Sequence, residues 1–145
     1  MADTDRRQVS LERVEEGVYR ATNPRGAQLT FGSKDPDGFS PVELLLAAIG
    51  GCSAVDVDVV TGRHAPHERF EVTVEADAIR DEVGNRLDDV TMTFHVTFPA
   101  GEAGDKARAR LPGAVRTSHD RTCTVSRTVE AATPVTVHIA DDPVT

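Results

Sequence analysis

Two cysteines are the residues of this chain best suited to chemistry, because a thiolate is both a nucleophile and a redox centre. Cys52 and Cys123 are the only thiols among the 145 residues. If the protein carries out redox chemistry, the two sulfur atoms must therefore do so together. The alternative is that both are core residues, since a free cysteine often behaves as a small buried hydrophobic side chain.

The neighbours of each cysteine decide how reactive its thiol is. Cys52 directly follows a Gly-Gly pair. If a helix breaks at that pair, Cys52 lies in the first turn of a new segment, where free N–H groups stabilise a thiolate. If the helix is continuous, Asp56 at the fourth following position disfavours the thiolate. Near Cys123, the residues that could stabilise a negative sulfur are His119, Arg121 and Arg127.

Other residues are weaker candidates for a site. His64 and His67 form a His-x-x-His pattern, but Pro66 between them breaks helical geometry, so a surface loop is favoured over a metal site. His95 and His138 fall in expected strands and are interpreted as structural. No phosphate-binding loop, dinucleotide motif or serine-nucleophile motif occurs in the sequence. We predict no metal site and no bound cofactor.

Composition is typical of one globular domain over residues 1–145, with disorder expected over residues 1–8. The net charge of −8 argues against nucleic acid and against anionic membrane surfaces, which need clustered Lys and Arg. No run of about 18 apolar residues appears, so no transmembrane helix is predicted. The polar N-terminus is not typical of a signal peptide. We expect a cytoplasmic protein, where paired thiols are catalytic, redox-sensing or inert.

The elements that must position the thiols begin with short strands between Val9 and Gly32. A helix is predicted from Pro41 to about Thr61, with Ser40 as its N-cap and Glu43 closing a capping box. Its first half is apolar nearly all round, which is typical of an element buried on most sides. The Gly-Gly pair within it predicts close packing or a kink.

Two strands with period-two alternation follow, over 70–78 and 90–98, and predict a long antiparallel hairpin with one apolar face. A helix is expected over 105–111, resuming beyond Pro112 and Gly113, and a further helix from about Thr122. A closing strand is predicted over 135–139. This order of segregated strands and helices predicts an α+β fold. Aromatic residues are few, at 4%, which weakly favours a dimer that buries additional surface.

Two blocks of the sequence strongly resemble the OsmC/Ohr family of thiol peroxidases. They are residues 40–52 (SPVELLLAAIGGC) and residues 118–129 (SHDRTCTVSRTV). The resemblance covers nearly the whole chain from about Val9 onward. It implies the OsmC-like fold, with an antiparallel sheet wrapped around a long central helix. It also implies an intertwined homodimer with active sites at the interface.

The resemblance further implies a function in oxidative stress defence, the reduction of a small organic hydroperoxide. Cys52 corresponds to the peroxidatic residue and Cys123 to the resolving residue. Cys52 would be oxidised to a sulfenic acid and then condense with Cys123 to a disulfide. An external dithiol, lipoyl-type in the well-studied branches and carried by a dithiol-reducing protein, would restore the two thiols.

The sequence departs from the best-characterised hydroperoxide reductases at one catalytic position. Their glutamate directly follows the proline at the helix start, whereas here that position is Val42 and Glu43 comes one residue later. Arg25 is the candidate for their active-site arginine. This pattern resembles the divergent OsmC-like branch. Two alternatives stay open: a non-catalytic binding module for a small hydrophobic ligand, and a slow redox sensor.

Overall fold

A computed structural model describes residues 4–140 of the chain. The chain consists of two compact parts, residues 1–48 and residues 49–145, which are described separately below. The single domain expected from the sequence stays a prediction. The expected disorder of residues 1–8 falls partly on residues 1–3, outside the described residues, while residues 4–9 form neither helix nor strand.

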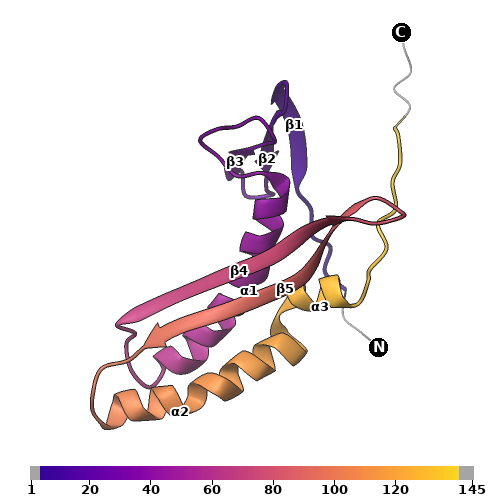
Figure 1. Cartoon of the computed structure of the whole chain (residues 1–145). Helices are drawn as coiled ribbons and strands as arrows, with labels where there is room; N and C mark the ends of the chain where they lie inside the picture. Colours follow the sequence, from indigo (N-terminus) through magenta and orange to yellow (C-terminus); the bar gives the residue numbers. More distant parts are fainter. Residues whose placement is uncertain (1–3, 141–145) are drawn as a thin grey trace. The chain divides into compact units, whose positions relative to one another are not determined.

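The first part contains a three-stranded antiparallel sheet in the order β1-β2-β3 (Figure 1). Its strands are β1 (Ser10–Glu15), β2 (Val18–Thr22) and β3 (Gln28–Phe31), which confirms the short strands predicted before Gly32. The side-chain oxygen of Asn23 accepts the backbone N–H of Arg25 at 3.0 Å and shapes the turn between β2 and β3.

Helix α1 (Pro41–Gly62) begins with the predicted capping box. The Ser40 hydroxyl accepts the Glu43 backbone N–H at 3.2 Å, and the Glu43 carboxylate accepts the Ser40 backbone N–H at 2.8 Å. The backbone and hydroxyl of Ser40 together hold the pKa of Glu43 below its ordinary value. The helix continues through the Gly-Gly pair, so Cys52 does not begin a new helical segment.

Within residues 49–145, α1 buries one face made of every fourth residue. Such spacing places side chains on a single stripe of a helix. Val55 and Val59, in contrast, are 63% and 53% exposed. The buried residues of this stripe are Ile49, Ser53, Val57 and Thr61, and Gly50 beside it is buried as well.

By length and composition alone, α1 could cross a membrane, which corrects the expectation that no stretch of the chain qualifies. The helix itself was predicted, but Asp56 and Asp58 interrupt its apolar residues, so it did not stand out as an apolar run. In its most apolar 18-residue window, 28% of the residues are buried inside the chain. The core helix of a protein outside membranes passes the same test, so this property does not by itself indicate a membrane.

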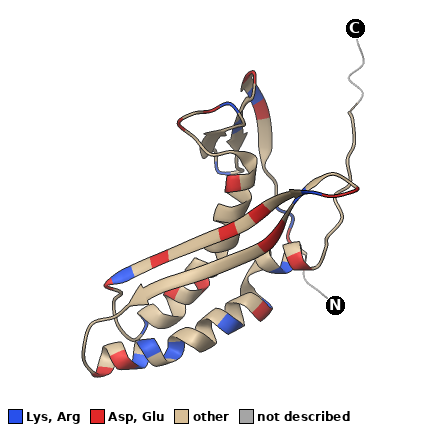
Figure 2. Ribbon diagram, in the orientation of Figure 1, with Lys and Arg blue, Asp and Glu red and all other residues tan. Residues whose placement is uncertain are grey.

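The second part also contains the predicted hairpin, formed by β4 (Arg69–Arg80) and β5 (Asn85–Thr97) (Figure 1). Its register pairs Phe70 with Val96 and Val74 with Met92, so the alternating apolar residues share one face as predicted. The other face is polar, and acidic residues follow the hairpin in Figure 2. The hairpin packs closely on α1, because a Cβ added to Gly50 would lie 2.7 Å from a methyl group of Val74.

Two helices and a π-helical turn follow the hairpin: α2 (Glu102–Thr117), η1 (Ser118–Thr122) and α3 (Thr124–Glu130). The interruption expected at Pro112 was wrong, because α2 continues through that residue. Proline removes one N–H group without ending the helix here. Basic residues gather on α2 in Figure 2. The predicted last helix is confirmed, and it begins at Thr124 because the preceding residues form η1.

The closing strand predicted over 135–139 is not formed, which corrects the sequence expectation, and His138 does not lie in a strand. Val135, Val137 and Ile139 are between 81% and 91% exposed. The physical reason is that a strand needs a neighbouring edge for its backbone hydrogen bonds, and no described strand pairs with this segment.

Candidate active site at the two thiols

The structure brings the two cysteines together within residues 49–145. Cys52 lies on α1 and is half-buried, whereas Cys123 lies directly before α3 and is completely buried. Both are free thiols. The Cys52 thiol lies near enough to the Cys123 thiol and to the backbone N–H groups of Thr124 and Val125 for each of them to shift its pKa. The free N–H groups near Cys52 are therefore those at the N-terminus of α3, and α1 does not break at Cys52. The catalytic roles of the two thiols stay a prediction.

The surroundings of the Cys52 thiol shift its pKa in opposite directions. Burial is the largest, and it raises the pKa of Cys52 above its ordinary value. The Val125 N–H group lowers this pKa, the adjacent Cys123 thiol raises it, and the Thr124 N–H group lowers it slightly. The net result is a raised pKa. Within the single chain, Cys52 is therefore mainly protonated at neutral pH.

Cys123 forms the cap of α3 with its own sulfur. Its Sγ donates to the Ser126 hydroxyl at 3.3 Å and accepts the Ser126 backbone N–H at 3.5 Å. These contacts hold the buried thiol in one orientation beside Cys52. The partner of the Cys123 thiol is thus Ser126, rather than the charged neighbours that the sequence suggested.

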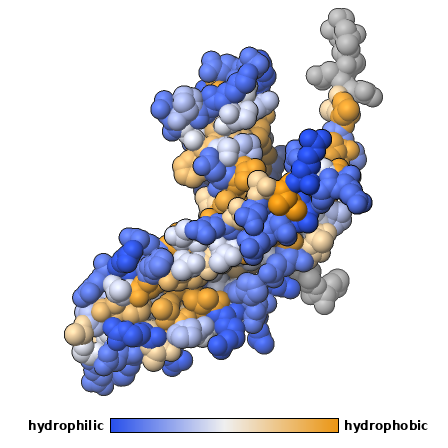
Figure 3. Space-filling model, viewed as in Figure 1, coloured by the Kyte–Doolittle hydropathy of each residue, from blue (hydrophilic) through white to orange (hydrophobic). Residues whose placement is uncertain are grey.

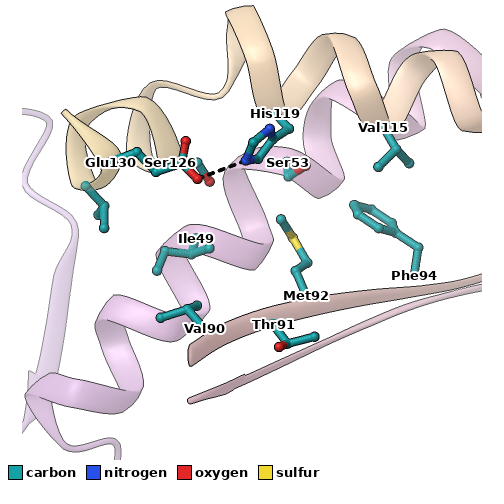
Figure 4. A pocket seen from close by; sticks show the side chains of 11 residues that line it. Ile49, Ser53, Val90, Thr91, Met92, Phe94, Val115, His119, Ser126 and Glu130 are labelled. Carbon is teal, nitrogen blue, oxygen red and sulfur yellow. Dashed lines mark hydrogen bonds and ion pairs between the residues drawn. The ribbon is translucent and has the colours of Figure 1, made fainter. Parts of the chain in front are cut away.

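His119, one of those charged neighbours, has partners other than the thiols. Its Nδ1 is 2.9 Å from Asp120 Oδ1. Its Nε2 is 2.9 Å from Glu130 Oε1, and these two side chains are drawn in Figure 4. The hydrogen bonds that the His119 ring donates to these two carboxylates, that to Asp120 first, raise the pKa of His119. The positive charge of His119 is therefore compensated by carboxylates.

A cavity of about 370 Å³ lies beside the thiol pair. It is lined by residues of α1, β5, α2, η1 and α3, and its walls are mainly apolar (Figure 4). Apolar side chains also reach the surface of the part that contains β4, β5 and α2 in Figure 3. Neither cysteine lines the cavity, but Ser53 follows Cys52 in sequence, and Ser126 binds Cys123. The lining residues are Ile49, Ser53, Val90, Thr91, Met92, Phe94, Val115, His119, Ser126, Val129 and Glu130.

A polar network around Asp56 is the feature that the sequence reasoning missed. Asp56 Oδ2 accepts the Ser118 hydroxyl at 2.8 Å and the Thr122 hydroxyl at 2.9 Å. The Ser118 oxygen is also 3.0 Å from the Ser53 hydroxyl. From the sequence, Asp56 was expected only to disfavour the Cys52 thiolate through its negative charge. Its position one helical turn after Cys52 was the signal that it shares the face of α1 turned to Cys123.

The other predicted residues have surroundings and partners of their own. Glu43 is held by the capping box, and Arg25 lies in an exposed turn of the first part. Val42 is 49% exposed. His95 lies in β5, as expected. Among residues 4–140, no group of three or more His, Cys, Asp or Glu side chains is arranged to hold a metal ion.

His67 is mostly buried, which corrects its placement in a surface loop. Its ring packs on Phe70 and Phe98 with centroid distances of 4.9 and 5.2 Å. Its Nε2 is 2.8 Å from the Thr61 hydroxyl, and its Nδ1 is 3.5 Å from Asp58. The group Thr61, His67 and Asp58 resembles the nucleophile, base and acid of a catalytic triad. The Thr61 hydroxyl, however, is completely buried and donates to a backbone carbonyl at 2.8 Å. We therefore interpret this group as structural.

Solved structures similar to this chain share its fold. A hypothetical protein from Aquifex aeolicus is 24% identical, with a TM-score of 0.71 over 90% of this chain and 91% of the other. An OsmC-like protein of unknown function from Vibrio cholerae has a TM-score of 0.71 at 11% identity, over 88% and 95% of the two chains. The organic hydroperoxide resistance protein OhrB of Bacillus subtilis has a TM-score of 0.51 at 17% identity, over 86% and 90%.

Sequence comparison identifies the family. Uncharacterised proteins of Mycobacterium tuberculosis and Mycobacterium bovis are 32% identical over 136 residues, which cover 92% of this chain and 96% of theirs. The sequence profile described as "OsmC-like protein" matches residues 32–138, which include both cysteine blocks, β4, β5 and the helices that follow. The α+β architecture, with antiparallel sheets and helices, agrees with this match. The chain therefore belongs to the OsmC-like protein family.

Proposed function

We propose that this protein is a thiol peroxidase that reduces a small organic hydroperoxide, with Cys52 as the peroxidatic residue and Cys123 as the resolving residue. The observation that carries the proposal is the proximity of two free thiols, one half-exposed and one buried, of which Cys123 shifts the pKa of Cys52. Family membership adds support, since one structural neighbour is named as an organic hydroperoxide resistance protein.

The proposed reaction has two steps on the protein. The Cys52 thiolate attacks the terminal oxygen of the hydroperoxide, the O–O bond breaks, and an alcohol leaves after taking up a proton. The resulting sulfenic acid is then attacked by Cys123, which gives a disulfide and water. Cys52 is the more exposed thiol, so it is the one that an external peroxide reaches first.

Regeneration requires two electrons from outside the chain. We assign this step to an external dithiol, lipoyl-type or similar, carried by a dithiol-reducing protein in the cytoplasm. No bound cofactor is needed for either half of the cycle. Arg25 is our candidate for the family's active-site arginine, and Val42 replaces the family's glutamate, so the intrinsic reactivity rests mainly on the groups around Cys52.

We further propose that the active protein is an intertwined homodimer in which sheet strands wrap around α1 of both copies. Three observations support a second copy of the chain that covers apolar surface left exposed in a single copy. The outer face of α1 leaves Val55 and Val59 more than half exposed. The segment 133–140 is extended and unpaired within the described residues, although its apolar side chains alternate as in a strand. Finally, α1 is far more apolar than a solvent-exposed helix.

A steady-state assay with cumene hydroperoxide and a dihydrolipoyl reductant tests the proposal. Wild type is expected to consume hydroperoxide, and Cys52→Ser is expected to abolish turnover. Cys123→Ser is expected to stop at the oxidised Cys52, because the resolving thiol is missing. Equal activity in the two variants would contradict the assigned roles.

Two alternatives each have a specific observation in their favour. The cavity of about 370 Å³ favours a binding module for a small apolar ligand. Thermal stabilisation by such a ligand that persists without both cysteines would support it. The raised pKa of Cys52 favours a slow redox sensor, because a protonated thiol reacts slowly. Measuring the rate of thiol oxidation, rather than its end point, separates the sensor from the enzyme.

A further inference from the structure

The Asp56 carboxylate ties the segment before Cys123 to α1. One oxygen, Oδ2, accepts both the Ser118 and the Thr122 hydroxyls, at 2.8 and 2.9 Å. These two residues are the first and the last of the π-helical turn η1. A single atom on α1 therefore holds both ends of the turn that leads into Cys123.

The turn η1 directly determines where Cys123 lies. The backbone N–H of Cys123 donates to the Ser118 carbonyl at 2.7 Å, which closes the π-helical turn. Single π-helical turns are rare and are frequently found at functional sites. Hydrogen bonds to a charged acceptor are stronger than those between neutral groups, so the two bonds to Asp56 are suited to stabilising such a turn.

Asp56 and Cys52 are held on the same side of α1. They are separated by one helical turn, so their side chains lie next to each other on one face. Cys52 lies near Cys123, which shifts its pKa, while Asp56 accepts a hydrogen bond from the turn directly before Cys123. The carboxylate thus fixes η1 to the same helix that carries the other thiol.

We propose that Asp56 is a positioning residue for disulfide formation, which holds η1 against α1 and thereby keeps Cys123 within bonding range of Cys52. This inference rests on the proposed peroxidase function. In the step concerned, the Cys123 sulfur attacks the sulfur of the Cys52 sulfenic acid and the S–O bond breaks. The hydroxide that leaves takes up the proton of Cys123 and departs as water. Asp56 does not contact the reacting atoms.

Kinetic trapping is the first test. In Asp56→Ala treated with an organic hydroperoxide, disulfide formation is expected to slow roughly tenfold, and the Cys52 sulfenic acid accumulates as its dimedone adduct. Asp56→Asn keeps an acceptor oxygen and is expected to lie between wild type and Asp56→Ala. Asp58→Ala removes the same charge from the same helix without touching η1, and it is expected to match wild type.

Equilibrium in a glutathione redox buffer provides a second test that does not depend on hydroperoxide chemistry. The ratio of Cys52–Cys123 disulfide to dithiol is expected to fall roughly tenfold in Asp56→Ala and to stay unchanged in Asp58→Ala. If the wild type does not react with hydroperoxide but Asp56→Ala still lowers the disulfide ratio, the proposed function is refuted. The positioning role of Asp56 is then retained.

A further variant keeps the inference testable if Asp56→Ala does not fold. Thr122→Val removes one of the two hydrogen bonds and leaves the carboxylate and its Ser118 partner in place. It is expected to lower the disulfide ratio in the same direction by a smaller factor. A disulfide ratio and a disulfide-forming rate equal to wild type in Asp56→Ala, or in Thr122→Val where that variant replaces it, would overturn the inference.

Discussion

At the scale of single residues, the chemistry of this protein depends on how Cys52 is surrounded. Backbone N–H groups at the start of α3 favour a negative sulfur, whereas burial and the second thiol disfavour it, and the latter effects prevail. Cys52 therefore has a second thiol nearby but lacks a strong activating charge within the described residues. This combination predicts a nucleophile whose rate is limited by the supply of thiolate.

The pH dependence of Cys52 follows from the sign of this shift. Because the pKa of Cys52 is raised above the ordinary thiol value of 9.0, its thiolate fraction is small at neutral pH and grows about tenfold per pH unit below the pKa. The rate of alkylation by iodoacetamide, assigned to Cys52 by peptide mass, is expected to keep rising as far as pH 9.0.

Cys52→Ser provides the control for this profile, since the remaining thiol is completely buried and is expected to react far more slowly. A rate that levels off near neutral pH would show that Cys52 is already ionised there. That result would contradict the raised pKa.

At the scale of elements, α1 organises the second part of the molecule. It carries Cys52 and Asp56 toward η1 and Cys123, and it presents Gly50 to the hairpin. The two adjacent glycines differ sharply in their surroundings. A Cβ at Gly50 would meet Val74 at 2.7 Å, whereas a Cβ at Gly51 would meet no described atom within 4 Å.

This contrast predicts opposite effects for two neighbouring substitutions. Gly50→Ala is expected to lower the free energy of unfolding by about 1–3 kcal/mol, because the added methyl group pushes against the hairpin. Gly51→Ala is the matched control, and the greater helix propensity of alanine predicts a gain of up to about 1 kcal/mol. Urea unfolding measures both. Equal losses in the two variants would mean that close packing of the hairpin is not what requires Gly50.

At the scale of the whole molecule, the described chain leaves apolar surface without cover. The exposed valines of α1 and the alternating residues of the segment 133–140 both belong to this surface. A second copy of the chain would bury α1 and offer a strand edge to the segment, which explains both features together.

The dimer proposal predicts the sedimentation behaviour. Wild type is expected to sediment at twice the chain mass of 15.6 kDa. Val55→Asp places a charge on the exposed face of α1 and is expected to shift the protein toward single chains. Val83→Asp is the matched control, because Val83 is 99% exposed in the hairpin turn. A wild type that sediments as a single chain would contradict the dimer.

Much of the fold could be predicted because its signals are local. The capping box at Ser40 and Glu43 and the alternation of the hairpin depend on neighbouring residues, and both are confirmed. The prediction of a strand over 135–139 was wrong, because a strand also requires the edge of a neighbouring strand, which the local sequence pattern does not indicate. The prediction of an interruption at Pro112 was wrong, because an α-helix tolerates the loss of one N–H group when both flanking turns remain helical.

The candidate site was predictable only in part. The two cysteine blocks pointed to the thiols, and the structure places these near each other. The role of Asp56 could not be deduced, because its partners Ser118 and Thr122 are far away in the sequence and are brought to it by the π-helical turn. Sequence proximity also assigned His119 to Cys123, whereas its partners are Asp120 and Glu130.

Treatment of the reduced protein with one equivalent of an organic hydroperoxide tests the central claim most directly. We predict that both thiols are consumed and that peptide mass analysis finds a disulfide between Cys52 and Cys123 of the same chain. Two free thiols remaining after complete exposure to the hydroperoxide would contradict the account.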